Sequence, residues 1–121
     1  MPFPSHIMGT GQSPLSSQNI CGSGATALVA VGSNQATALQ LSASWNTITT
    51  SSASTGVKLL TCEQGAHMGI RNDSGQTITI YPKETSGVTI NAGASSVTLA
   101  TATSMFIFAP SATTWATVTS A

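Results

Sequence analysis

The side chains that could perform chemistry are few and widely separated in this chain. Its 121 residues include three acidic side chains, two histidines and two cysteines. They are Glu63, Asp73, Glu84, His6, His67, Cys21 and Cys62. Two carboxylates facing one substrate could support acid–base catalysis, and a histidine beside a serine could activate a nucleophile. However, all three carboxylates fall in predicted turns, where Asp73 most simply caps its own backbone.

No catalytic or metal-binding motif connects these residues. Serine is so abundant that a serine near His67 carries little information, and the Gly-x-Ser-x-Gly elbow of hydrolases is absent. The histidines and cysteines lack the paired spacings of zinc sites. The glycines at 22 and 24 are not followed by the Lys-Ser/Thr of a phosphate-binding loop. The sequence therefore predicts no enzyme, no metal and no cofactor.

Charged residues are unusually scarce. They form 5% of the chain, against roughly 25% in an ordinary soluble domain, and the net charge is zero. A surface with so little charge repulsion predicts association with copies of itself or with another protein. Phosphate binding needs clustered cations, and Lys58, Arg71 and Lys83 are the only basic side chains. Nucleic acid is therefore not expected as a partner.

No apolar stretch is long enough for a membrane span, so no membrane association is expected. The N-terminus lacks the basic start and continuous apolar run of a signal peptide, which argues against export by that route. Without export, Cys21 and Cys62 are predicted to be buried thiols, although pairing between them stays open.

The first part of the chain, residues 1–21, is predicted to be an extended arm. It holds three of the five prolines, together with glycine, serine and glutamine, and shows no apolar alternation. Four dispersed apolar side chains in it are candidates for docking onto a neighbouring subunit. They are Phe3, Ile7, Met8 and Leu15. The alternative is a leader that binds nothing.

Residues 22–121 are predicted to form one β domain, organised around residues 75–82. In that stretch Ile78 and Ile80 alternate with polar or amphipathic side chains, as in a half-buried strand. The preceding Asn-Asp-Ser-Gly, residues 72–75, favours a hairpin because these residue types tolerate positive φ.

The rest of the domain reads as short strands separated by turns, without a capped amphipathic helix. Further strands are expected at residues 25–31, 37–41, 45–50, 57–60, 68–71, 88–90, 96–99, 104–109 and 115–119. Residues 104–109 form the most apolar run and are predicted to be a central strand buried on both faces. This pattern favours an all-β fold, a small antiparallel sandwich or barrel-like domain.

The order of these landmarks resembles that of small virion structural proteins of tailed bacteriophages, over about residues 32–121. The similarity lies in residues 35–41, 46–50, 55–59, 65, 70–72, 80–82, 90–91, 106–108 and 115. It is a spacing of turn and strand residues and contains no catalytic signature. Related sequences are variously described as capsid decoration, head-fibre or tail-associated proteins.

The resemblance implies a structural role in the virion. The expected protein is a capsid decoration or cement protein that forms a homotrimer, lies on the capsid surface and is assembled in the host cytoplasm. Its arm would bind the major capsid protein. Trp45, Tyr81 and Trp115 are the candidate anchors for self-association or packing. The alternative is a head- or tail-fibre module that binds a host surface glycan through exposed aromatic rings.

Overall fold

The computed structural model describes residues 22–120, and this part of the chain is all-β with no helix. The predicted fold class is thus confirmed at this level. The strands are β1 (Gly24–Val29), β2 (Leu39–Gln40), β3 (Trp45–Thr50), β4 (Gly56–Lys58), β5 (His67–Asn72), β6 (Ile78–Tyr81), β7 (Thr89–Ile90), β8 (Val97–Leu99), β9 (Thr103–Ser111) and β10 (Thr114–Thr119).

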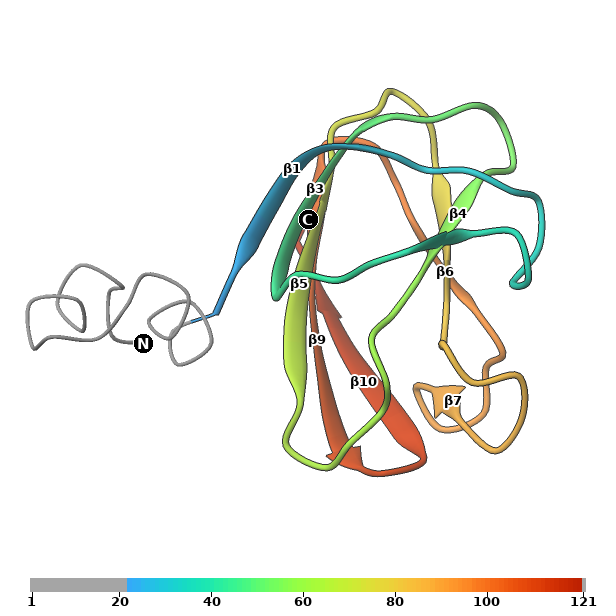
Figure 1. Ribbon diagram of the computed structural model, residues 1–121, viewed down its shortest axis with the longest axis vertical. Coiled ribbons are helices and arrows are strands. Elements are labelled where there is room, and N and C mark those ends of the chain that lie inside the picture. Colours follow the sequence, from blue (N-terminus) through green and yellow to red (C-terminus); the bar gives the residue numbers. More distant parts are fainter. Residues whose placement is uncertain (1–21, 121) are drawn as a thin grey trace, which may run out of the picture.

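The strands form two mixed sheets arranged like a β-solenoid (Figure 1). The larger sheet has the order β1-β3-β5-β9-β10-β7, and the smaller sheet has the order β2-β4-β6-β8. From β1 to β6 the chain alternates between the sheets, so that each strand lies parallel to the strand two places earlier. Later in the chain, the pairs β6–β8, β5–β9 and β9–β10 are antiparallel, whereas β7 and β10 are parallel.

The expectation of an antiparallel domain was therefore wrong for the first half of the chain. Consecutive strands there belong to different sheets, and the chain returns to each sheet in the same direction after a full coil. Parallel neighbours need such long connections, whereas antiparallel neighbours can be joined by a tight turn. Among the strands of residues 22–120, only β9 and β10 are both consecutive and paired.

The core lies between the two sheets. Ile78 and Ile80 of β6 are fully buried, as their alternation predicted, and they face side chains of the larger sheet. Trp115 is the largest fully buried side chain. Other buried members come from both sheets and include Leu41, Ile48, Val57, Leu59, Met68, Ile70, Ile90, Leu99 and Ile107.

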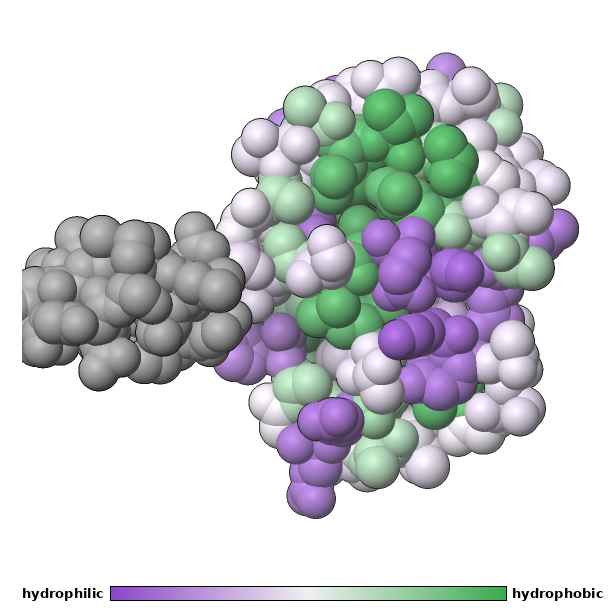
Figure 2. All heavy atoms as spheres, viewed as in Figure 1, coloured by the Kyte–Doolittle hydropathy of each residue, from purple (hydrophilic) through white to green (hydrophobic). Residues whose placement is uncertain are grey.

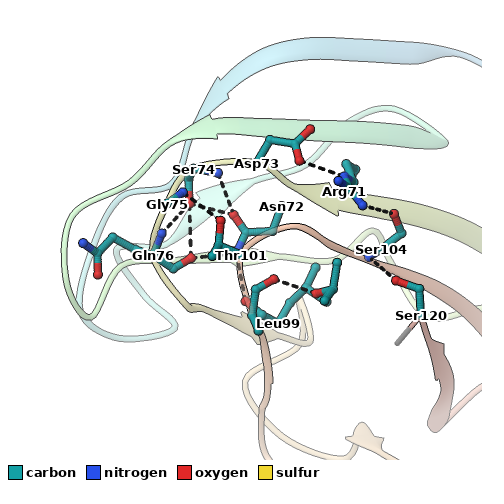
Figure 3. A network of polar contacts seen from close by, with 12 residues as sticks. Arg71, Asn72, Asp73, Ser74, Gly75, Gln76, Leu99, Thr101, Ser104 and Ser120 are labelled. Atoms are coloured by element: carbon teal, nitrogen blue, oxygen red, sulfur yellow. Dashed lines mark hydrogen bonds and ion pairs between the residues drawn. The ribbon is translucent and has the colours of Figure 1, made fainter.

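The segment 72–75 is a corner between the sheets, which corrects the predicted hairpin (Figure 3). β5 and β6 on either side of it are not paired with each other. The residue that shapes the corner is Asn72, whose buried side chain accepts a hydrogen bond from the Ser74 amide at 3.1 Å. Asp73, the predicted capping residue, instead pairs with Arg71.

β9 is a central strand, as predicted, but only one of its faces is buried. Met105 and Ile107 point into the core, while Phe106 and Phe108 are 39% and 36% exposed on the outer face of the larger sheet. Within residues 22–120, no second layer covers this face. The continuous apolar run concealed an ordinary strand alternation, because both of its faces carry apolar side chains.

The predicted arm, including Phe3, Ile7, Met8 and Leu15, lies outside the described residues. Cys21 also lies outside them.

Candidate functional site

The outer face of the larger sheet carries an exposed apolar row that crosses four strands. Trp45, Gly69, Phe106 and Val118 are register partners in β3, β5, β9 and β10. Trp45 is 44% exposed and Val118 is 61% exposed. Large apolar side chains that stay exposed together on one surface typically mark an interaction site.

Gly69 determines how the Trp45 side chain lies. A Cβ atom at residue 69 would overlap with Cε3 and Cζ3 of the indole. The indole therefore lies over the backbone of β5, in space that any other residue would fill. The Trp45 and Phe106 ring centroids are 6.2 Å apart, with the ring planes tilted by 30°.

The neighbouring register position extends this aromatic surface. His67 of β5 pairs with Phe108 of β9. The Phe106 ring is close to both, with centroid distances of 6.2 Å to His67 and 5.9 Å to Phe108. These separations fall in the range in which aromatic pairs attract one another. His67 is thus part of an aromatic cluster on the sheet surface.

A polar row runs beside the apolar row, on the opposite side from His67. It consists of Thr47, Arg71 and Ser104, which are register neighbours in β3, β5 and β9, and of Ser120, which directly follows β10 and whose amide donates to the carbonyl oxygen of Ser104. Arg71 donates from Nη1 to Ser104 Oγ at 3.3 Å, and its Nε lies 2.8 Å from Asp73 Oδ1. Figure 3 shows this group at the end of β5. Asp73, which lies next to the row, balances the charge of Arg71, so the row and Asp73 together carry no net charge.

A groove of about 420 Å³ lies between these two rows. It is lined by residues from both, including Trp45, Thr47, Arg71, Ser104, Phe106, Val118 and Ser120. Its walls differ in chemistry: one is aromatic and aliphatic, and the other presents hydroxyl and guanidinium groups. An amphipathic ligand with one apolar face and one hydrogen-bonding edge would match both walls.

The predicted chemistry-bearing residues do not form one site. His67 contacts Phe106, Asp73 pairs with Arg71, and Glu84 Oε1 accepts a hydrogen bond from the Cys62 amide at 2.9 Å. Glu63 is exposed in a turn. Among residues 22–120, no group of three or more histidine, cysteine or acidic side chains could hold a metal ion.

Cys62 is buried, as predicted, and forms no disulfide within the described part of the chain. Burial raises the pKa of its thiol, and the nearby Glu84 carboxylate raises this pKa further. Its Sγ atom lies 3.5 Å from the carbonyl oxygen of Ser111. A buried thiol that stays protonated is a poor nucleophile, so this geometry favours a packing role.

We expect Cys62 to react slowly with Ellman's reagent at pH 8, at least about tenfold more slowly than in urea-unfolded protein. Because the folded state raises the thiol pKa, its contribution to stability is complete below the pKa of the unfolded thiol. That contribution is lost as the pH rises through the folded pKa. In a Cys21→Ser background, Cys62 is the one thiol that can react with the reagent. Equal reaction rates in folded and unfolded protein would contradict the prediction.

The three predicted anchor residues lie at three separate places. Trp45 is exposed and lines the groove, Tyr81 is half-buried in β6 next to Gly56, and Trp115 is in the core. Sequence reasoning missed Gly69, Phe106, Phe108 and Val118 as members of the exposed face. Phe106 and Phe108 alternate with Met105 and Ile107, and this two-residue period was the available signal.

The described residues form an all-β, solenoid-like fold, and one face of its larger sheet carries exposed apolar side chains. No protein-family model, curated protein or solved structure matches the chain. Among the described residues, no helix is long and apolar enough to cross a membrane.

Proposed function

We propose that this protein is a structural component of a phage virion, a capsid decoration or cement protein without enzymatic activity. In this proposal it forms a homotrimer on the capsid surface and reinforces contacts between major capsid subunits. The observation that carries the proposal is the exposed apolar edge at β1, in a chain with three basic and three acidic residues. The resemblance to small virion proteins supports the same role.

The edge consists of β1 and the residues that follow it. β1 is the terminal strand of the larger sheet, and Val29 and Val31 are 47% and 42% exposed. Figure 2 shows strongly hydrophobic atoms gathered near the top of the view, over the region where β1 ends in Figure 1. Exposed strand edges and the ends of solenoids normally need a cover, which a neighbouring subunit would provide.

The energetics suit a protein that is present in many copies. Apolar contacts contribute roughly 25 cal/mol per Å² of buried area before association costs are subtracted. Few charges need desolvation on a surface of this composition, so modest contacts remain favourable. Many such contacts, repeated by symmetry, would resist internal pressure together. Residues 1–21 directly precede β1, which suits an arm that reaches from this edge onto the capsid.

The direct test mixes the purified protein with capsids that lack it. We expect saturable co-sedimentation and a higher temperature for heat-induced release of the packaged DNA. A Val29→Ser, Val31→Ser double variant should weaken both effects by removing apolar contact area. Thr49→Ser, at an exposed position of β3, is the matched control. Capsids that neither bind the protein nor gain thermal stability would overturn the proposal.

A further inference from the structure

We propose that the groove on the outer face of the larger sheet binds a neutral saccharide. This binding site goes beyond the structural role and does not depend on it. The groove is lined by residues of β3, β5, β9 and β10, and neither Val29 nor Val31 of the proposed capsid-binding edge is among them. A protein attached to a particle through its β1 edge would leave this face free to contact another surface.

The first argument is the chemistry of the apolar wall. A pyranose ring has one face made of C–H groups, and such a face packs well against an aromatic ring. Trp45 and Phe106 provide two neighbouring rings at a centroid distance of 6.2 Å, and Val118 continues the wall. Trp45 is 44% exposed, so part of its indole is accessible to a ligand.

The second argument is the chemistry of the polar wall. Thr47, Ser104 and Ser120 present hydroxyl groups, each of which can donate and accept hydrogen bonds. Sugar hydroxyls need both kinds of partner. Arg71 has five N–H donors, and its contacts with Asp73 and Ser104 use the Nε and Nη1 atoms, which leaves donors on Nη2.

The third argument concerns charge. The single cation of the groove, Arg71, is already paired with Asp73 at 2.8 Å, so the site has no unpaired charge to attract an anion. A phosphate or an acidic polymer would therefore gain little here. Neutral hydroxyl-rich ligands match this balance best, because they need hydrogen bonds without a counter-charge.

The fourth argument is preorganisation. The lining residues belong to neighbouring strands of one sheet, and the backbone at Gly69 supports the Trp45 indole from below. Rigid aromatic contacts reduce the entropy cost of binding. The groove volume of about 420 Å³ is within the roughly 300–1,000 Å³ of small-molecule sites.

The test is a titration of the full chain with maltotriose, cellotriose, mannotriose and chitotriose, followed by tryptophan fluorescence and by amide NMR shifts. The chain has two tryptophans, and Trp115 is fully buried, so a surface ligand should change only the Trp45 emission. We expect saturable changes with at least one of these sugars, and shifts confined to the groove residues of β3, β5, β9 and β10.

Two variants separate the site from the fold. Trp45→Ala should weaken binding at least about tenfold by removing the stacking ring. Gly69→Ala should weaken it comparably, although the indole is retained, because the new Cβ displaces the ring from its seat. Thr98→Ala, at an exposed position of β8 in the smaller sheet, should leave the affinity unchanged. The emission of Trp115 and circular dichroism report whether each variant is folded.

Three results would overturn the proposal. One is that none of the four sugars changes the Trp45 emission or the groove amides. Another is that binding survives unchanged in both Trp45→Ala and Gly69→Ala. The third is that the free protein self-associates and Trp45→Ala abolishes that association, which would assign this face to a second copy of the chain. The sugar titration uses the free protein without capsids. A protein that fails to bind capsids can therefore still bind a sugar, and the two proposals can fail separately.

Discussion

Replacing Asn72 by alanine is expected to lower the free energy of unfolding by about 3 kcal/mol or more, the largest loss we predict for a polar side chain. The expected value follows from the four hydrogen bonds that disappear, one of which is the buried bond to the carbonyl oxygen of Leu99. Urea unfolding followed by the emission of buried Trp115 measures it directly.

The Asn72 side chain satisfies all its hydrogen-bonding capacity inside the protein. It is 0% exposed, and its Nδ2 atom donates to the carbonyl oxygens of Gln76 at 2.7 Å and Leu99 at 2.8 Å. Its Oδ1 atom accepts from the Ser74 amide and, at 2.6 Å, from the Ser74 hydroxyl (Figure 3). Alanine would remove these bonds and leave two carbonyl groups without this donor.

Asn46→Ala is the matched control for this prediction. Asn46 is also buried, at 3% exposed, and its Nδ2 atom donates to the carbonyl oxygens of Ala43 at 2.9 Å and Gly69 at 3.2 Å. Its Oδ1 atom, however, has no hydrogen-bond partner in the described structure. The loss should therefore be smaller than for Asn72→Ala. Equal losses, or a loss below about 1 kcal/mol for Asn72→Ala, would contradict this account of the corner.

Asn72 also shows why the strands were predictable and their connections were not. The alternation of Ile78 and Ile80 is a local pattern, and it correctly identified a half-buried strand. An Asn-Asp-Ser-Gly segment, in contrast, can close a hairpin or turn a corner between sheets. The choice depends on where the Asn72 side chain finds its partners, and one of them, Leu99, is 27 residues away.

The groove was beyond sequence reasoning for a similar reason. Its two walls are assembled by register across four strands, from β3 to β10, and no short segment contains enough of either wall to form a motif. Gly69 reads as an unremarkable glycine within a strand, and its role depends on Trp45 packing over it from the neighbouring strand. Trp45 itself was predicted as a candidate anchor, but its neighbours were not.

Removing residues 1–20 is expected to abolish capsid binding while leaving the β domain folded. Within residues 22–120, the buried core cluster extends from Ala30 to Trp115, and all of these members remain in the truncated chain. We therefore expect a cooperative unfolding transition within a few degrees of that of the full chain. The oligomeric state, measured by sedimentation equilibrium, should stay unchanged, because the proposed self-association uses the β domain.

A full-length variant tests whether the apolar side chains of residues 1–20, and not merely the presence of this segment, are needed for capsid binding. Serine at positions 3, 7, 8 and 15, in place of Phe3, Ile7, Met8 and Leu15, keeps the length of the segment and removes its large apolar side chains. If these side chains dock on the capsid, this variant should lose binding as completely as the deletion does, since burial of apolar area drives the contact. Undiminished capsid binding by the truncated chain would show that the β domain makes the contact. Unfolding of the truncated chain would show that residues 1–20 belong to the folded unit, and either result would refute the arm.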